Sequence, residues 1–160
     1  MSMNSRYIVI ALMCIFVIPF ILYIVIGMFL TQRIRQDNKQ SLFENGSVPV
    51  GMSGNYEGNA DGQGSWLGKE FYEDGTGINN FDNGDSVQQQ IPFKYYVGKS
   101  VSDDGLDVLK IDYNIPENPF YLRLILDELV ELENGSYLGK VNFMLIPFFP
   151  ITFTYFTLEK

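Results

Sequence analysis

The chain has 160 residues, enough for one domain beside a membrane segment, and its formal net charge is −8. Residues 65–160 carry this entire excess, with fifteen acidic and seven basic side chains. Nucleic-acid binding needs clustered Lys and Arg, so the acidity argues against a nucleic-acid partner. The sequence contains no His, and Cys14 is its only cysteine. Histidine-dependent catalysis, histidine metal sites and disulfides within the chain are therefore excluded.

The first predicted element is a membrane-spanning helix over residues 7–30. These 24 residues contain no Asp, Glu, Lys, Arg, Asn or Gln. A helix of this length reaches ~36 Å, and the hydrocarbon core of a bilayer is ~30 Å thick. A cleaved signal peptide has a shorter apolar region that ends in small residues, and this stretch has neither feature. We therefore predict an uncleaved, single-pass membrane anchor.

The orientation of this anchor is left open by the charges that flank it. Arg6 lies before the apolar stretch, whereas Arg33, Arg35 and Lys39 follow it. Lys and Arg close to a span favour the cytoplasmic side, and here they lie on both sides. The side of the membrane that carries the following domain is therefore undetermined.

Composition divides the rest of the chain into a linker and one domain. Residues 1–40 form the anchor with a polar extension. Residues 41–64 are rich in Gly, Ser and Asn and poor in aliphatic side chains, which predicts a flexible linker. Residues 65–160 contain short alternating runs separated by turns rich in Gly, Asp and Asn. We expect about seven strands there, forming a small antiparallel barrel or a strongly curved sheet.

The strongest turn signal is Asn134-Gly135, which lies between two β-like runs. Asn-Gly is the preferred pair for a two-residue hairpin loop, and such a loop fixes the strand register. This register predicts an inner face made of the residues Leu122, Leu124, Leu126, Val130, Leu132, Tyr137, Val141, Phe143 and Leu145. It predicts a solvated face made of the residues Arg123, Asp127, Glu131, Lys140 and Asn142.

Glu128 is the one charged residue on the predicted inner face. A carboxylate there needs a partner or must take up a proton. Lys69 lies on the same side of the first strand as Leu67 and Phe71, so it is the predicted partner. Three interpretations stay open: a structural ion pair or a carboxylate bonded to loop amides, a pair that contacts a ligand, and a catalytic carboxylate.

Five aromatic residues complete the predicted ligand-binding set with Lys69 and Glu128; they are Trp66, Tyr95, Tyr113, Phe143 and Tyr155. Such side chains most often form a core, but a barrel with inward aromatic rings can also hold a flat or apolar ligand. The acidic turn at residues 82–85 misses the spacing of a calcium-binding loop, and no phosphate-binding glycine motif is present. We predict no metal and no cofactor.

Two short motifs resemble those of a known family. Trp66-Leu67-Gly68-Lys69 with Phe71 is similar to the W-x-G-K-x-F opening of small, mostly uncharacterised lipocalin-like proteins. Asp127-Glu128, followed by residues 134–140, is similar to the late D-E … G-x-Y-L-G hairpin of those proteins. The resemblance covers about residues 65–158. It implies a lipocalin-like barrel and the binding of a hydrophobic ligand.

The expected function is that of a membrane-anchored binding module for a hydrophobic or lipid-like ligand near the bilayer. One alternative is an interaction domain with a filled core that docks a membrane protein. Another is an enzyme that uses Glu128 with Lys69. The expected partners are therefore the bilayer together with a hydrophobic small molecule, a lipid or a membrane protein.

Overall fold

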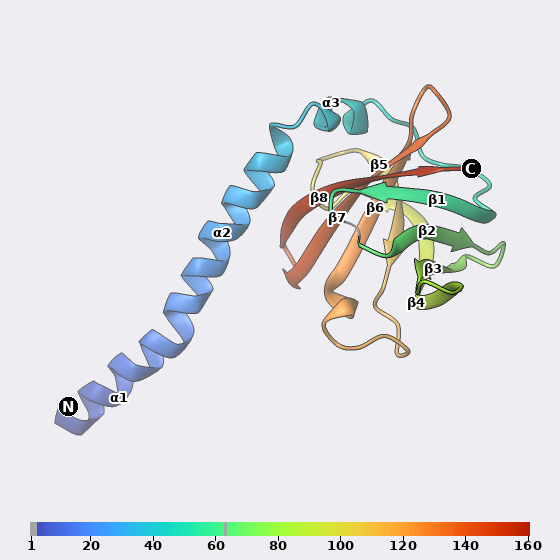
Figure 1. The fold of residues 1–160 in the computed structure, drawn as a ribbon. Helices are drawn as coiled ribbons and strands as arrows, with labels where there is room; N and C mark the ends of the chain where they lie inside the picture. The colour runs from blue at the N-terminus through green and yellow to red at the C-terminus, as the bar shows by residue number, and fades with distance from the viewer. Residues whose placement is uncertain (1–2, 63) are drawn as a thin grey trace.

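The computed structural model describes residues 3–62 and 64–160 and consists of an N-terminal helical segment and a closed antiparallel β-barrel (Figure 1). The predicted fold class, an apolar helix plus a small all-β barrel, is confirmed. The barrel has eight strands rather than about seven, because one strand lies upstream of the predicted domain.

The helical segment comprises α1 (Met3–Leu12), a π-helical turn η1 (Met13–Val17) and α2 (Ile18–Arg35). The π-helical turn ends two residues before Pro19. The proline ring crowds the preceding turn of an α-helix, and proline has no backbone N–H to donate, so the regular hydrogen-bond pattern is interrupted there. Within the described residues, one helix is long and apolar enough to cross a membrane, from Ile10 to Arg35. Most of this helix is exposed. A membrane span and a signal sequence both match these features.

The predicted flexible linker is wrong for much of residues 41–64. The short helix α3 (Lys39–Glu44) runs into this range, Ser47 forms a bridge with Glu131, and β1 (Gly54–Ala60) follows. β1 is hydrogen-bonded to strands on both sides. Its order thus comes from backbone pairing with only Tyr56 fully buried, so a composition poor in apolar side chains conceals it.

The remaining strands follow in chain order around the barrel. They are β2 (Trp66–Phe71), β3 (Thr76–Asp82), β4 (Val87–Lys99), β5 (Asp107–Asp112), β6 (Ile125–Glu131), β7 (Tyr137–Ile146) and β8 (Phe149–Glu159), with a short 3-10 helix η2 (Leu122–Leu124) before β6. Each strand pairs with the next, and β8 pairs with β1. The closed ladder leaves the barrel without an unpaired edge strand.

The β6–β7 hairpin differs from its prediction by one residue. The backbone N–H of Leu132 donates to the carbonyl of Ser136 at 2.8 Å, so the loop has three residues and ends on Gly135, whose φ is +82°. A glycine in this conformation is typical of three-residue hairpin loops. Glu128 therefore pairs with Lys140, not with Val141. A shift of one residue moves every side chain to the opposite face.

Because of this shift, the predicted inner and outer faces of β6 are exchanged. Leu126, Glu128 and Val130 lie on the outer face and are nevertheless buried. Val130 is covered by α3, whose Phe43 packs against the outer surface of the barrel together with Val108, Leu138 and Tyr155. Glu128 is covered by the loop between β4 and β5. Both faces of this part of the sheet are thus apolar, and hydrophobicity alone does not distinguish them.

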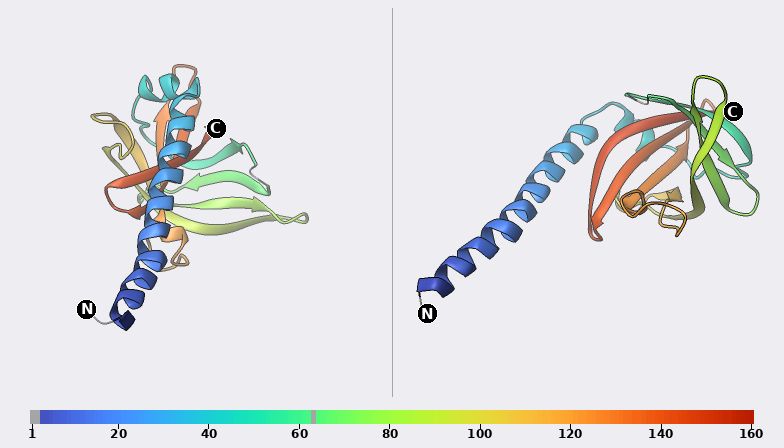
Figure 2. Two further views of the ribbon diagram at one scale, coloured as in Figure 1. Left: turned by 90° about the vertical axis from the view of Figure 1, so that its left-hand side faces the viewer. Right: turned by 60° about the horizontal axis from the view of Figure 1, so that its bottom comes forward.

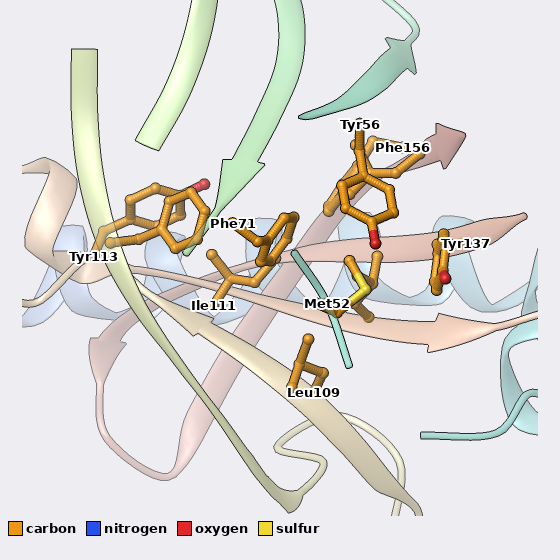
Figure 3. Close-up of a cluster of buried hydrophobic side chains, with 11 residues drawn as sticks. Met52, Tyr56, Phe71, Leu109, Ile111, Tyr113, Tyr137 and Phe156 are labelled. Atoms are coloured by element: carbon orange, nitrogen blue, oxygen red, sulfur yellow. The ribbon is translucent and has the colours of Figure 1, made fainter. Parts of the chain in front are cut away.

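The barrel interior holds a second cluster, built mainly from aromatic side chains (Figure 3). Tyr56 makes edge-on contacts with Phe71 and Tyr137, with ring centroids 5.4 Å apart in both pairs. Met52, just before β1, also packs in this cluster. Met52, Tyr56, Phe71 and Tyr137 fill the end of the barrel at which β1 begins, which we call the closed end.

We predict that a fragment of residues 36–160 folds cooperatively and that a fragment of residues 62–160 is less stable by at least ~3 kcal/mol. The shorter fragment lacks β1, which closes the barrel, and Phe43, which is buried against the outer surface. Removal of a buried Phe side chain alone lowers the free energy of unfolding by ~3–5 kcal/mol. Urea unfolding followed by the fluorescence of Trp66, present in both fragments, measures the difference. Equal free energies of unfolding would contradict the role of β1 in closing the barrel.

Candidate ligand-binding site

The barrel encloses a cavity of about 190 Å³ at the end opposite the closed end. Its lining consists of the residues Ala60, Trp66, Lys69, Asn79, Phe81, Ile91, Tyr113, Leu122, Ile125, Asp127, Val141 and Phe156. Most of these side chains are apolar. The polar ones, Lys69, Asn79, Tyr113 and Asp127, are all buried. The cavity therefore combines apolar walls with one buried polar group of side chains, which we call the inner polar cluster.

Lys69 is the centre of the inner polar cluster. Its ammonium group lies 3.1 Å from Asp127 Oδ2, and both side chains are almost fully buried. It also donates to Asn79 Oδ1 at 2.9 Å and to the Tyr113 hydroxyl. The three N–H donors of Lys69 thus all have acceptors. The rings of Trp66, Phe93, Tyr113 and Phe156 lie 5.1–5.4 Å from Nζ, a distance at which aromatic faces attract a cation.

Only one of the two carboxylate oxygens of Asp127 has hydrogen-bond partners. Its Oδ2 atom accepts from Lys69 and from the Tyr113 hydroxyl, the latter at 2.9 Å. Its Oδ1 atom is buried and has no hydrogen-bond partner among the described residues. A buried acceptor without a donor costs ~1–3 kcal/mol or more when it is charged. Because Asp127 lines the cavity, a donor group on a bound molecule could reach this atom.

Burial dominates the protonation behaviour of the inner polar cluster. It raises the pKa of Asp127 and lowers the pKa of Lys69, while the attraction between the two charges opposes both changes. Burial, followed by the nearby charge of Asp127, raises the pKa of Tyr113 well above its ordinary value. Tyr113 therefore stays protonated, which lets it donate to Asp127.

A β-bulge brings Trp66 and Lys69 into the same cavity. The pairing of β2 with β3 shifts register between Trp66 and Gly68, so that side chains three residues apart both point inward. Gly68 has a φ of +133°, and a Cβ atom there would lie 2.1 Å from the carbonyl oxygen of Tyr56. Only glycine fits this position.

The structure places Asp127, not Glu128, beside Lys69. The predicted Lys69–Glu128 pair is therefore wrong, because the hairpin register differs by one residue. Glu128 lies on the outer surface under the loop between β4 and β5. There its carboxylate accepts from the Ser100 hydroxyl at 2.7 Å and from the backbone N–H of Val101. Asp127 was missed, although a three-residue loop ending on Gly135 would have revealed it.

The predicted aromatic residues divide between several places. Trp66 and Tyr113 line the cavity, whereas Phe143 is partly buried outside its lining. Tyr95 donates to the carbonyl of Tyr72 at 2.6 Å, in the loop between β2 and β3 at the closed end. Tyr155 packs on the outer surface, where its hydroxyl donates to Gln40.

The predicted solvated face of the hairpin is also buried in part. Lys140 pairs with Asp103 beneath α3, and its ammonium lies 4.4 Å from the ring centre of Phe43. Asn142 is fully buried and accepts a hydrogen bond from Thr152 at 2.6 Å. The Lys140 contacts connect α3 and the β4–β5 loop to the outer wall of the barrel, and the Asn142 bond joins β7 to β8, which indicates a structural role for both residues.

Comparisons with protein-family models, with curated proteins and with solved structures found no match. In the described part of the chain, no group of three or more His, Cys, Asp or Glu side chains could hold a metal ion. The cavity and its inner polar cluster therefore define the chemistry of the site.

We predict that Asp127→Ala lowers the free energy of unfolding by ~3–5 kcal/mol, because it leaves the buried Lys69 without its anion. The double variant Lys69→Met/Asp127→Leu should recover much of this loss, since apolar side chains of similar volume suit the interior. Denaturant unfolding of the single and double variants measures both effects.

The matched control is the exposed ion pair between Lys99 and Asp107, whose charged atoms lie 2.9 Å apart. Asp107→Ala should change the free energy of unfolding by less than ~1 kcal/mol, because water screens an exposed pair. A loss in Asp127→Ala no larger than that in Asp107→Ala would show that Asp127 is not the buried partner of Lys69.

Proposed function

We propose that this chain is a single-pass, membrane-anchored β-barrel that binds a small amphipathic or lipid-like molecule. The observation that carries the proposal is the unpartnered Oδ1 atom of Asp127, which belongs to the inner polar cluster of a cavity with mostly apolar walls. A ligand with an apolar body and one hydrogen-bond donor, such as a hydroxyl or ammonium group, complements this arrangement. Its donor would bond to Asp127, and its body would pack against Ile125, Val141 and Phe156.

The size of the cavity limits the ligand. About 190 Å³ corresponds to the liquid volume of ~6 water molecules and is below the ~300–1,000 Å³ of pockets for drug-sized molecules. The bound group is therefore a small molecule or one end of a longer one. A short alkyl chain that carries a hydroxyl or amine meets this limit.

The topology and the two sequence motifs support the same class of ligand. An eight-stranded barrel in which each strand pairs with the next is the architecture of lipocalins, many of which enclose apolar molecules. Trp66 and Lys69 of the first motif and Asp127 of the second all line the cavity. This support is by analogy of fold and motif, and the chemistry rests on the residues themselves.

The apolar helix supports a location at the membrane. It is long enough to cross a bilayer, and its surface is exposed and apolar along most of its length. Anchoring would hold the barrel next to the phase in which lipid-like ligands concentrate. The cavity favours this proposal over a filled-core interaction domain. The position of Glu128 outside the barrel removes the basis of the proposed enzyme.

Trp66 is the only tryptophan and lines the cavity, so its fluorescence reports occupancy. We predict that an octanol brominated on its terminal carbon quenches Trp66 saturably. The matching brominated octanoate should bind at least ~10-fold more weakly, because it offers no donor to Asp127 and is repelled by its charge. A hydrogen bond to a charged group contributes ~1.5–3 kcal/mol, and ~1.4 kcal/mol is a factor of ten in affinity.

Two substitutions separate binding in the cavity from binding elsewhere. Val141→Phe fills part of the cavity and should weaken quenching by the alcohol, whereas Val97→Phe, at an exposed position near the closed end and outside the cavity lining, should leave it unchanged. Equal quenching by alcohol and carboxylate, or no effect of Val141→Phe, would contradict the proposed site.

A further inference from the structure

The C-terminal half of α2 lies beside β8 on the outside of the barrel (Figure 2). The ring of Tyr23 lies 6.2 Å from that of Phe149, centre to centre. Two turns further along, Thr31 Oγ1 accepts a hydrogen bond from the backbone N–H of Thr152 at 3.2 Å. Arg35 then donates to the carbonyl of Ser102 at 2.6 Å, in the loop between β4 and β5. Positions spaced by four residues lie on one helix face, so α2 runs along the outside of the barrel.

Gly27 lies on the same face, between Tyr23 and Thr31, and lets the helix approach β8 closely. A Cβ atom at this position would lie 2.6 Å from Ile151 Cδ1 and 3.1 Å from Phe149 Cε1. The backbone of α2 is thus in contact with the side chains of β8. This contact fixes how far along the helix the barrel is placed.

The contact also fixes the depth of the β7–β8 turn if residues 7–30 cross the bilayer. Tyr23 precedes Leu30 by seven residues, or ~10 Å along the helix axis. The predicted span is ~6 Å longer than the hydrocarbon core is thick. The edge of the hydrocarbon core can therefore lie at most about four residues before Leu30. Phe149, opposite Tyr23, therefore remains at least ~4 Å inside the hydrocarbon core.

The composition of the β7–β8 hairpin suits this depth. No charged side chain occurs from Val141 to Leu158, a run of 18 residues. Phe148, in the turn, is 96% exposed, and Leu145 and Phe153 are exposed as well. Backbone pairing continues to Ile146 and Phe149, directly beside the turn. Inserting this turn would therefore place few unpaired backbone groups in lipid, where they are costly.

A second exposed aromatic segment lies at the same end of the barrel. Phe120 is 73% exposed and Tyr121 is 64% exposed, just before η2, which packs beside β7. Aromatic side chains concentrate where proteins meet the surface of a bilayer. Phe120 and Tyr121, with Leu145 and Phe148 at the same end of the barrel, are the exposed apolar residues that we call the lipid-facing rim.

The cavity lies at this end too. Ala60 is the last residue of β1, and Trp66 and Ile125 are the first residues of β2 and β6. All three line the cavity and are partly exposed, whereas aromatic side chains fill the closed end. The cavity is therefore accessible from the end of the barrel that carries the lipid-facing rim.

From this arrangement we infer that the lipid-facing rim inserts into the same bilayer that α2 crosses, and that ligands enter the barrel from the membrane. The inference rests on the proposed membrane span and adds which surface of the barrel meets lipid. A lipid-like molecule could then pass from the bilayer into the cavity without crossing water.

The test uses the full-length chain in phosphatidylcholine vesicles whose acyl chains are brominated. Trp66 is replaced by Phe, and one tryptophan is introduced by Phe148→Trp, Phe20→Trp or Val50→Trp. Phe148 and Val50 are both highly exposed, so neither change disturbs packing. Phe20→Trp reports on the helix, and Val50→Trp reports on the connection between α3 and β1 near the closed end. We expect at least a twofold loss of fluorescence for Phe148→Trp and Phe20→Trp, and no loss for Val50→Trp.

The three reporters distinguish the inference from the proposed function. Quenching of Phe20→Trp without quenching of Phe148→Trp would overturn the inference and leave the membrane span intact. Absence of quenching in both would overturn the span and the inference together. Equal quenching of Val50→Trp and Phe148→Trp would also overturn the inference, because the barrel would then contact lipid without the stated orientation. Ligand binding is measured separately, through Trp66 in the unaltered chain.

Discussion

Backbone hydrogen bonds between β1 and β8, from the pair Glu57–Glu159 to the pair Ala60–Phe156, convert an open meander into a closed barrel. Closure satisfies the two strands that would otherwise form exposed edges. It also fixes the position of β8, which contacts the cavity on one face and the helix on the other. Phe156 points into the barrel and forms a wall of the cavity, whereas Ile151 packs against Gly27 of the helix. The cavity and the position of the helix therefore depend on the same pairing.

The closed barrel then contains an uneven interior. Around Lys69 and Asp127, desolvation of two charges is offset by their mutual attraction, by Tyr113 and by surrounding aromatic rings. One carboxylate oxygen is left over. The cavity therefore has a polar region at the inner polar cluster, and the rest of its lining is apolar. Such polarity would orient an amphipathic molecule with its donor group inward and its apolar part toward the accessible end.

Sequence patterns predicted the fold class because they depend on simple periodicities. The apolar stretch up to Leu30 and the alternation in strands such as β4 are visible without a structure. β1 was missed because backbone pairing, rather than apolar side chains, holds it in place. A sequence shows such pairing only weakly.

The candidate site was predicted in part. Lys69 was correctly expected to point inward, but its partner was misplaced by one residue. Asn134-Gly135 favours a two-residue loop, yet a single glycine with positive φ also ends a three-residue loop. Burial could not correct the register, because α3 covers the outer face and makes it as apolar as the inner one. Trp66 joins Lys69 only through the bulge at Gly68, a local departure from alternation.

Hydrogen bonding of β1 on both edges also determines how the barrel responds to proteolysis. A protease that requires extended, flexible chain finds no suitable substrate from Gly54 to Ala60, despite the glycine content of this segment. Cleavage in the connection between α3 and β1 would cut the covalent link to the N-terminal helices. Tyr23, Gly27 and Thr31 would still hold β8 against the helix. A single cut there would leave the barrel packed on the helix, and release of a free domain would also require separation of α2 from β8.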